Sequence, residues 1–192
     1  MSSSIGIYAS QISGHLVTNN YSSIQTVTVG SGGASSITFS SIPSTWTHLQ
    51  IRYIARTADN GSGGIDNILA SFNGDTTYTN YRSHYLNGNG SATAAGSIQV
   101  SSFYTYVGDV ANSYNSNTTI YGVAVVDILD YANTNKNKVV RSINGADRNG
   151  SGSVNLTSAL WINTNAISAI TLNASSGASI SQYSTFALFG VK

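Results

Sequence analysis

The chain has 192 residues with a formal net charge of +1, and only 8% of them are charged while 41% are hydrophobic. An ordinary soluble domain carries about 25% charged residues, so the polarity of this chain comes from Ser, Thr, Asn and Gly. The absence of cysteine excludes disulfides, thiolate catalysis and Cys-ligated zinc.

Neither nucleic-acid binding nor membrane insertion is expected. Phosphate binding needs several clustered Lys or Arg, and the nearest approach to a cluster is Lys136, Lys138 and Arg141, which we interpret as a solvated strand end. No run of about 18 apolar residues occurs that could cross a membrane. The first residues also lack the basic and apolar regions of a secretion signal.

The first twenty residues, MSSSIGIYASQISGHLVTNN, lack the alternation of a strand. We expect residues 1–20 to form an extended N-terminal arm for attachment or subunit contact. A chain of this length suits one medium domain with a terminal arm, so residues 21–192 are predicted to form a single domain.

Residues 26–39, TVTVGSGGASSITF, contain two short strand-like runs around a glycine-rich turn. Val27 and Val29 precede the turn, and Ile37 and Phe39 follow it, so each run has one apolar side. This pattern predicts either a β-hairpin or two consecutive strands of a sandwich.

Residues 49–56, LQIRYIAR, show the clearest strand pattern, because every second residue from Leu49 is apolar or aromatic. Residues 118–131, TTIYGVAVVDILDY, are apolar on both sides. They predict a central strand that is covered on both faces or sealed against a neighbouring subunit; a buried helix is the alternative, which the valines disfavour. With the later segments KVVRSI, SALWINTNAISAITL and YSTFALFGVK, we expect about eight to ten strands in an all-β sandwich or barrel.

The seven aspartates do not point to catalysis. Asp59, Asp75 and Asp147 stand beside Asn or Gly in ADNG, NGDT and GADRNG, and we expect them to cap turns rather than to act as the carboxylate pair of a glycosidase. The segment DNGSGGID lacks the spacing of an EF-hand loop, so no metal site is expected. Three histidines occur, but no G-x-S-x-G motif. The sequence therefore predicts neither an enzyme nor a cofactor.

Aromatic residues with polar tips gather in TYTNYRSHYLNGNGS, residues 77–91, and in FYTY, residues 103–106. Such side chains suit stacking on a sugar or contact with a partner protein. Packing in the core is the alternative, since Tyr81 and Tyr85 share one face of a strand. The candidate contact residues are Tyr78, Tyr81, Arg82, His84, Tyr85, Tyr104 and Tyr106.

Four stretches resemble a known family. They are YSSIQTVTVGSGGASSITFSSIPSTWTHLQIRYIART, ILASFNGDTTYTNYRSHYLNGNGS, LWINTNAISAITL and YSTFALFGVK. Together they are similar to small β-rich bacteriophage virion proteins, common in aquatic phages and labelled as structural or tail-fibre proteins. The resemblance covers residues 21–192 and leaves the arm outside it.

The resemblance implies a jelly-roll-like antiparallel β-sandwich that serves in the virion as a capsid decoration, head fibre or tail component. Its implied partners are other virion proteins of the capsid or tail, and no catalytic residue is carried over. We expect a homo-oligomer, with a trimer favoured for a fibre or spike. The alternative function is a carbohydrate-binding module that recognises a host-surface glycan through the tyrosines.

Overall fold

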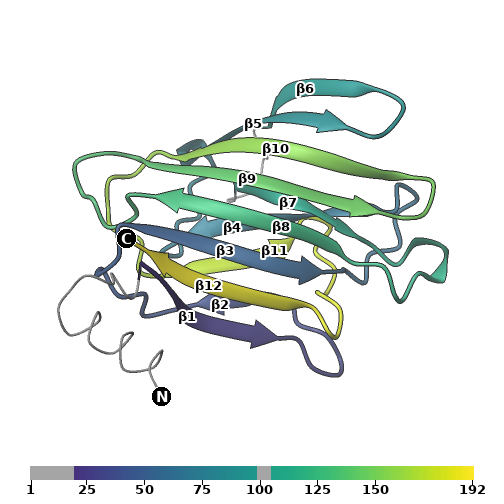
Figure 1. Cartoon of the computed structure of the whole chain (residues 1–192), viewed down its shortest axis with the longest axis horizontal. Helices are drawn as coiled ribbons and strands as arrows, with labels where there is room; N and C mark the ends of the chain where they lie inside the picture. Colours follow the sequence, from purple (N-terminus) through teal and green to yellow (C-terminus); the bar gives the residue numbers. More distant parts are fainter. Residues whose placement is uncertain (1–19, 99–104) are drawn as a thin grey trace, which may run out of the picture.

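The computed structural model describes residues 20–98 and 105–192. They form an all-β sandwich of two antiparallel sheets, as the sequence predicted. Figure 1 shows the larger sheet lying in front of the smaller one. The predicted arm, except for residue 20, and Tyr104 lie outside the described residues. No helix in the described part of the chain is long and apolar enough to cross a membrane.

The large sheet has eight strands. Their order is β1 (Tyr21–Thr28), β12 (Thr185–Val191), β3 (His48–Ala55), β8 (Gly122–Leu129), β9 (Lys138–Asp147), β10 (Gly152–Trp161), β5 (Tyr81–Gly88) and β6 (Thr93–Ile98). The last four strands in this order come from two hairpins, β9–β10 and β5–β6, that pair side by side. We call these four strands the extension, because they continue the large sheet past the edge of the small one, so that β5 and β6 lie beyond it (Figure 1).

The small sheet has four strands in the order β2 (Ile37–Phe39), β11 (Ile170–Ala174), β4 (Ile65–Phe72) and β7 (Thr105–Ala111). Two short 3-10 helices, η1 (Tyr78–Asn80) and η2 (Tyr114–Ser116), lie in the loops. The strands of the described residues number twelve rather than the eight to ten expected. The region after residue 77 contains more strands than we expected, because it forms the two hairpins β5–β6 and β9–β10.

The two runs of residues 26–39 do not pair with each other. β1 pairs with β12 in the large sheet, whereas β2 pairs with β11 in the small sheet. The hairpin interpretation is therefore wrong, and the alternative of two consecutive sandwich strands is confirmed. The intervening glycines carry the chain from one sheet to the other; Gly32 and Gly33 adopt positive φ angles that disfavour other residues.

Alternation along β3 follows the prediction. Leu49, Ile51, Tyr53 and Ala55 are buried and face the small sheet. Their neighbours in the core are the aromatic and aliphatic side chains of β2, β4, β8, β11 and β12, which form one continuous cluster. The burial of this cluster supplies the main stabilising free energy of a sandwich without disulfides.

Residues 118–131 contain the predicted central strand, β8, which lies between β3 and β9. Ala124, Val126 and Ile128 are buried against the small sheet. The opposite side of β8 is not covered by the residues that the structure describes, since Val123 is 53% exposed. The sequence offered two explanations for a strand that is apolar on both sides, and cover of this side by the described part of the chain is therefore wrong.

Lys138 corrects a prediction. We expected a solvated strand end, but Lys138 is fully buried while Lys136 and Arg141 are exposed. Its ammonium group donates hydrogen bonds to the backbone oxygens of Asn133 (2.7 Å), Lys136 (2.9 Å) and Thr164 (2.9 Å). Burial lowers the pKa of Lys138 from its ordinary value. The three carbonyl groups let the loop before β9 close over the charge.

Asp59, Asp75 and Asp147 cap turns, as predicted. Their carboxylates accept hydrogen bonds from the backbone N–H two residues later, at 3.0 Å, 2.9 Å and 2.8 Å respectively. These bonds fix the loops between strands without contributing to a paired carboxylate site.

Candidate functional site

The side of the large sheet that faces away from the small sheet carries an apolar face. We give this name to Ile54, Val123, Val125, Ile143, Val154, Leu156 and Leu86, which lie in two adjacent rows across β3, β8, β9, β10 and β5. All of them except Val125 are between 47% and 64% exposed. A contiguous apolar area of this kind is typical of an interaction surface rather than of free solvent-facing sheet.

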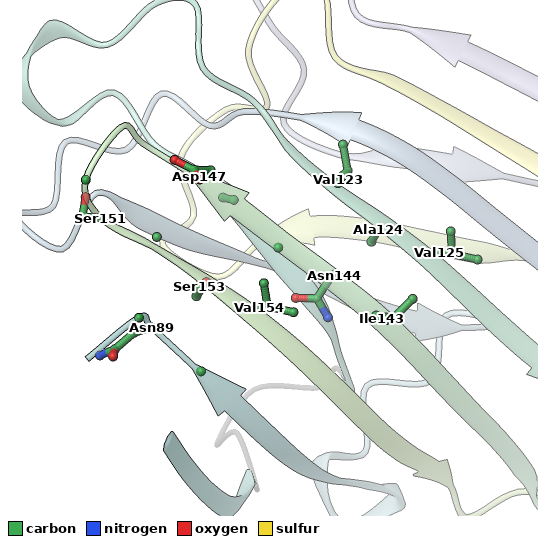
Figure 2. Close-up of a pocket in the computed structure, with 16 residues that line it drawn as sticks. Asn89, Val123, Ala124, Val125, Ile143, Asn144, Asp147, Ser151, Ser153 and Val154 are labelled. Atoms are coloured by element: carbon green, nitrogen blue, oxygen red, sulfur yellow. The ribbon is translucent and has the colours of Figure 1, made fainter. Parts of the chain in front are cut away.

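A hollow lies within the apolar face, over Gly145 of β9. Its volume is about 700 Å³, and β8, β9 and β10 line it together with the loops that follow β5 and β9. Figure 2 shows Val123, Val125, Ile143 and Val154 along its strands, and Asp147, Ser151 and Asn89 at the loop end. The hollow exists because Gly145 has no side chain between the exposed Val123 and Val154.

A polar band borders the apolar face on one side. Arg141 forms an ion pair of 2.9 Å with Asp127, and Gln50 donates a hydrogen bond of 2.8 Å to the same carboxylate. Arg52 in turn donates a hydrogen bond of 2.9 Å to Gln50. The charged groups thus lie at the rim, which is the usual arrangement of a protein interface.

The inner side of the extension is polar near the loop that joins β9 and β10, whereas its other end carries core residues such as Trp161 and Tyr81. Asn144, Asn155 and Asn87 lie opposite one another on β9, β10 and β5. The Asn155 amide donates a hydrogen bond of 3.1 Å to Asn144, and the Asn87 amide donates one of 2.7 Å to Asn155. This asparagine ladder replaces the apolar layer that fills the rest of the sandwich.

The asparagine ladder is hydrogen-bonded to a buried carboxylate of the small sheet, that of Asp109. Asp109 of β7 is 5% exposed and accepts hydrogen bonds from the Asn155 amide (2.7 Å) and the hydroxyl groups of Ser153 and Tyr106. Its backbone N–H also donates to the Asn144 side chain at 2.9 Å. Burial and the Asp109 carboxylate raise the pKa of Tyr106 far above its ordinary value, so its hydroxyl stays protonated and donates.

A β-bulge brings Tyr106 and Asp109 together. Residues three apart in a regular strand point to opposite sides. In β7 the register shifts between its pairs with Ile68 and Leu69, which leaves Val107 as an extra residue. The extra residue reverses the alternation, so Tyr106 and Asp109 share one face.

β7 is an edge strand of the small sheet, yet all seven of its residues are buried. The reason is that the extension continues past this edge, so β9 and β10 lie against β7. An open cleft of about 850 Å³ remains between β4 and β7 on one side and β10, β5 and β6 on the other. Tyr85, Tyr106, Asp109, Asn87 and Asn155 are among its lining residues.

The structure divides the predicted contact residues among four places. Tyr85 and Tyr106 meet at the cleft. Tyr81 is 2% exposed and lies in the core against Phe72, so the core-packing alternative holds for it. His84 is exposed and Arg82 is half-buried on the outer side of β5, and Tyr78 is 47% exposed in η1. These last three residues do not join the cleft.

Sequence reasoning missed the asparagine ladder and Asp109. Asn144 and Asn155 each alternate with apolar residues, in SING and SVNL, and this alternation was an available signal for a polar strand face. Asp109 carried no local signal, because its partners are remote in sequence.

Searches against protein-family models, curated proteins and solved structures return no match to the chain.

Proposed function

We propose that this protein is a structural subunit of a bacteriophage virion that associates with a second copy of itself through the apolar face. The apolar face is the observation that carries the proposal, because six large apolar side chains are exposed there at 47–64%. The free energy gained by covering apolar surface is roughly 25 cal/mol per Å². A partner that covers this face would therefore stabilise the subunit.

The size of the surface fits a stable contact. Six strands lie side by side, namely β3, β8, β9, β10, β5 and β6. Three rows of outward residues cross all six of them, the two rows of the apolar face and the row of Asp127 and Arg141. With a strand spacing of about 4.8 Å and about 6.8 Å between rows, since only alternate residues point outward, this part of the sheet measures roughly 600 Å². A standard protein interface covers about 600–1,000 Å² on each partner.

The outer side of β9 is complementary to itself, which favours a second copy as the partner. Arg141, Ile143, Gly145 and Asp147 follow one another on this side. A two-fold axis between Ile143 and Gly145 places Ile143 of each copy over the hollow at Gly145 of the other. The same axis sets Arg141 of each copy opposite Asp147 of the other. Isologous contacts require such self-complementarity.

We also infer that the fold is a jelly roll with two inserted hairpins. The order β1-β12-β3-β8 in one sheet and β2-β11-β4-β7 in the other supports this inference, because the chain crosses between sheets from β1 to β2, β3 to β4, β7 to β8 and β11 to β12. Removing the extension leaves two four-stranded sheets, as in a jelly roll of eight strands. This fold occurs in viral capsid proteins, in agreement with the resemblance of residues 21–192 to virion proteins.

Light scattering of the purified protein tests the association. We expect a mass of twice 20.0 kDa, and we expect Ile143→Glu to give the monomer, because an exposed isoleucine can be replaced without disturbing the core. Ile162→Glu is the matched control, since Ile162 is 41% exposed but lies outside the apolar face. A wild-type monomer, or a trimer as expected from the sequence, would contradict the two-fold contact.

A charge exchange tests the register of the contact. Arg141→Asp and Asp147→Arg are each expected to weaken the dimer, and the double variant is expected to restore it. If Arg141 acted only through its ion pair with Asp127 in the same chain, the double variant would not recover.

Immunogold electron microscopy tests the location. An antibody raised against the purified protein should label intact phage particles whose genome encodes the chain. Labelling of lysate protein alone, with unlabelled particles, would contradict a virion role.

A further inference from the structure

We propose that the cleft between β7 and the extension is a binding site for a neutral saccharide. The cleft and the hollow of the apolar face share Asn89 and the loop that joins β9 and β10 among their lining residues. The groups that carry this inference, Tyr85, Asn87 and Asp109, line the cleft alone, so the inference does not depend on the self-association proposed above. The chemistry of the cleft carries the inference.

The lining of the cleft is polar but almost uncharged. Amides and hydroxyls of Asn67, Asn87, Asn155, Ser153 and Tyr85 line it, and Asp109 is the one charged residue among the described lining residues. A single carboxylate opposes the binding of an anion. It also falls short of a divalent cation site, which draws on several oxygen ligands; no group of three or more His, Cys, Asp or Glu lies together in the described part of the chain.

The hydrogen bonds of the ladder leave defined groups free for a ligand. The Asn155 amide donates to Asp109 and Asn144, and its oxygen accepts from Asn87. The side-chain oxygen of Asn87 then has no partner among the described residues. The Tyr85 hydroxyl likewise makes no hydrogen bond to them. Both residues are half-buried at the cleft, where a ligand can reach them.

These groups are held in place before a ligand arrives. Asn155 and Asp109 are 4% and 5% exposed and fix the amide of Asn87 from behind. Tyr85 rests on Gly96 of β6, where a Cβ would come within 3.0 Å of its hydroxyl. Groups that are already ordered lose less conformational entropy on binding.

The free groups match the surface of a sugar. The Asn87 oxygen accepts a hydrogen bond from a hydroxyl, the Tyr85 hydroxyl both donates and accepts, and the tyrosine ring offers an apolar surface for the C–H groups of a pyranose. Saccharide hydroxyls need such mixed donors and acceptors. A cleft of about 850 Å³ has room for an oligosaccharide of a few sugar units.

Nuclear magnetic resonance of the ¹⁵N-labelled full chain tests the proposal with three probes, the neutral trisaccharides cellotriose, maltotriose and N,N′,N″-triacetylchitotriose. At least one of them is expected to shift the side-chain amide signals of Asn87 and Asn155. Asn87→Ala and Tyr85→Ala are each expected to weaken that binding about tenfold, which corresponds to the loss of about 1.4 kcal/mol. The Asn87→Ala spectrum also assigns the Asn87 signal.

His84→Ala is the matched control, because His84 lies on the opposite side of β5 and is exposed. It should bind the trisaccharide as the wild type does. A trisaccharide bearing sulfate groups should bind more weakly than its neutral parent, since Asp109 repels anions.

The proposal is overturned if none of the three trisaccharides shifts the Asn87 and Asn155 signals. It is also overturned if binding persists unchanged in both cleft variants, because the saccharide would then occupy another surface. The mass of the protein in solution is a separate readout, so failure of saccharide binding and failure of self-association are distinguishable.

Discussion

The indole nitrogen of Trp161 donates a hydrogen bond of 2.7 Å to the carboxylate of Asp75. Trp161 ends β10 and is 1% exposed, whereas Asp75 lies in the loop after β4. The same carboxylate accepts from the Asn80 amide at 2.8 Å. One carboxylate thus ties the extension to the small sheet, since Trp161 also packs on Phe72 of β4 with ring centroids 5.4 Å apart.

Asp75→Asn is expected to make the free energy of unfolding less dependent on pH in the acid range. Burial alone would raise the pKa of Asp75, but hydrogen bonds from Asn80, Trp161 and Thr77 outweigh it and hold the pKa below its ordinary value. A lowered pKa in the folded state adds stability above the ordinary pKa of about 3.9, and this stability is lost as the pH falls through the folded pKa. Urea unfolding at about pH 7 and about pH 3 should show a larger loss for the wild type than for Asp75→Asn.

A double-mutant cycle with Trp161→Phe isolates the bond itself. A hydrogen bond to a charged group contributes about 1.5–3 kcal/mol, so the two substitutions together should cost less than the sum of their separate effects. Additive effects would mean that the indole N–H and the carboxylate do not interact energetically.

Asp109→Asn is expected to destabilise the protein by about 1–3 kcal/mol. Every side-chain contact of the Asp109 carboxylate is a donor, from Tyr106, Ser153 and Asn155. An amide in its place turns an NH₂ group toward at least one of these donors and leaves it unsatisfied. Thermal or urea unfolding measures the change.

Asp147→Asn is the control for Asp109→Asn, with both made in the monomeric Ile143→Glu background so that the proposed contact of Asp147 with a second copy is absent. Asp147 is exposed and accepts one hydrogen bond from the backbone of Asn149, which an asparagine oxygen can also accept. A change within about 0.5 kcal/mol is expected. Equal effects at the two positions would contradict the structural role of the buried carboxylate.

Gly122→Ala is expected to cost about 1–3 kcal/mol through overpacking. A Cβ on Gly122 would come within 2.7 Å of the Val110 Cα and 3.0 Å of the Asp109 backbone oxygen. Because both contacts are with backbone, β8 and β7 would have to move apart. Gly30→Ala is the matched control, with nothing within 4 Å of its Cβ position, and a drop in unfolding free energy as large as that of Gly122→Ala would refute the close approach.

Lys138→Met is expected to destabilise the fold by about 1–3 kcal/mol, because three backbone carbonyl groups lose their donor. Methionine keeps most of the side-chain volume, so lost packing contributes little to the expected destabilisation. Lys136→Met provides the comparison, since the Lys136 side chain is 54% exposed and forms an ion pair with Asp130. Chemical denaturation should show a larger loss of unfolding free energy for Lys138→Met than for Lys136→Met. Similar losses for the two variants would argue against a stabilising role of the three carbonyl contacts.

Removing residues 1–20 is expected to leave the dimer intact, because the apolar face lies entirely within residues 21–192. Light scattering of the full chain and of residues 21–192 makes the comparison. A dimer that becomes a monomer on truncation would show that the N-terminal residues, not the apolar face, carry the association.

The sequence by itself determined the class of the fold and the faces of its strands. Alternation in residues 49–56 predicted which side chains of β3 are buried, because successive residues of a strand point to opposite sides. Aspartates beside Asn or Gly predicted turns for a local reason, since the carboxylate bonds to backbone two residues away. Both signals depend only on neighbours in the chain.

Only the tertiary structure decided which faces are covered and which side chains meet. Hydrophobicity alone assigns Val154 and Leu156 of β10 to the core, but they are 64% and 50% exposed while Asn155 between them is buried. The period of a strand shows which residues share a side; it does not show which side another sheet covers. Asp109 reaches Asn155 through a bulge and a strand pairing between distant segments. The cleft is therefore a product of long-range pairing, which no local pattern encodes.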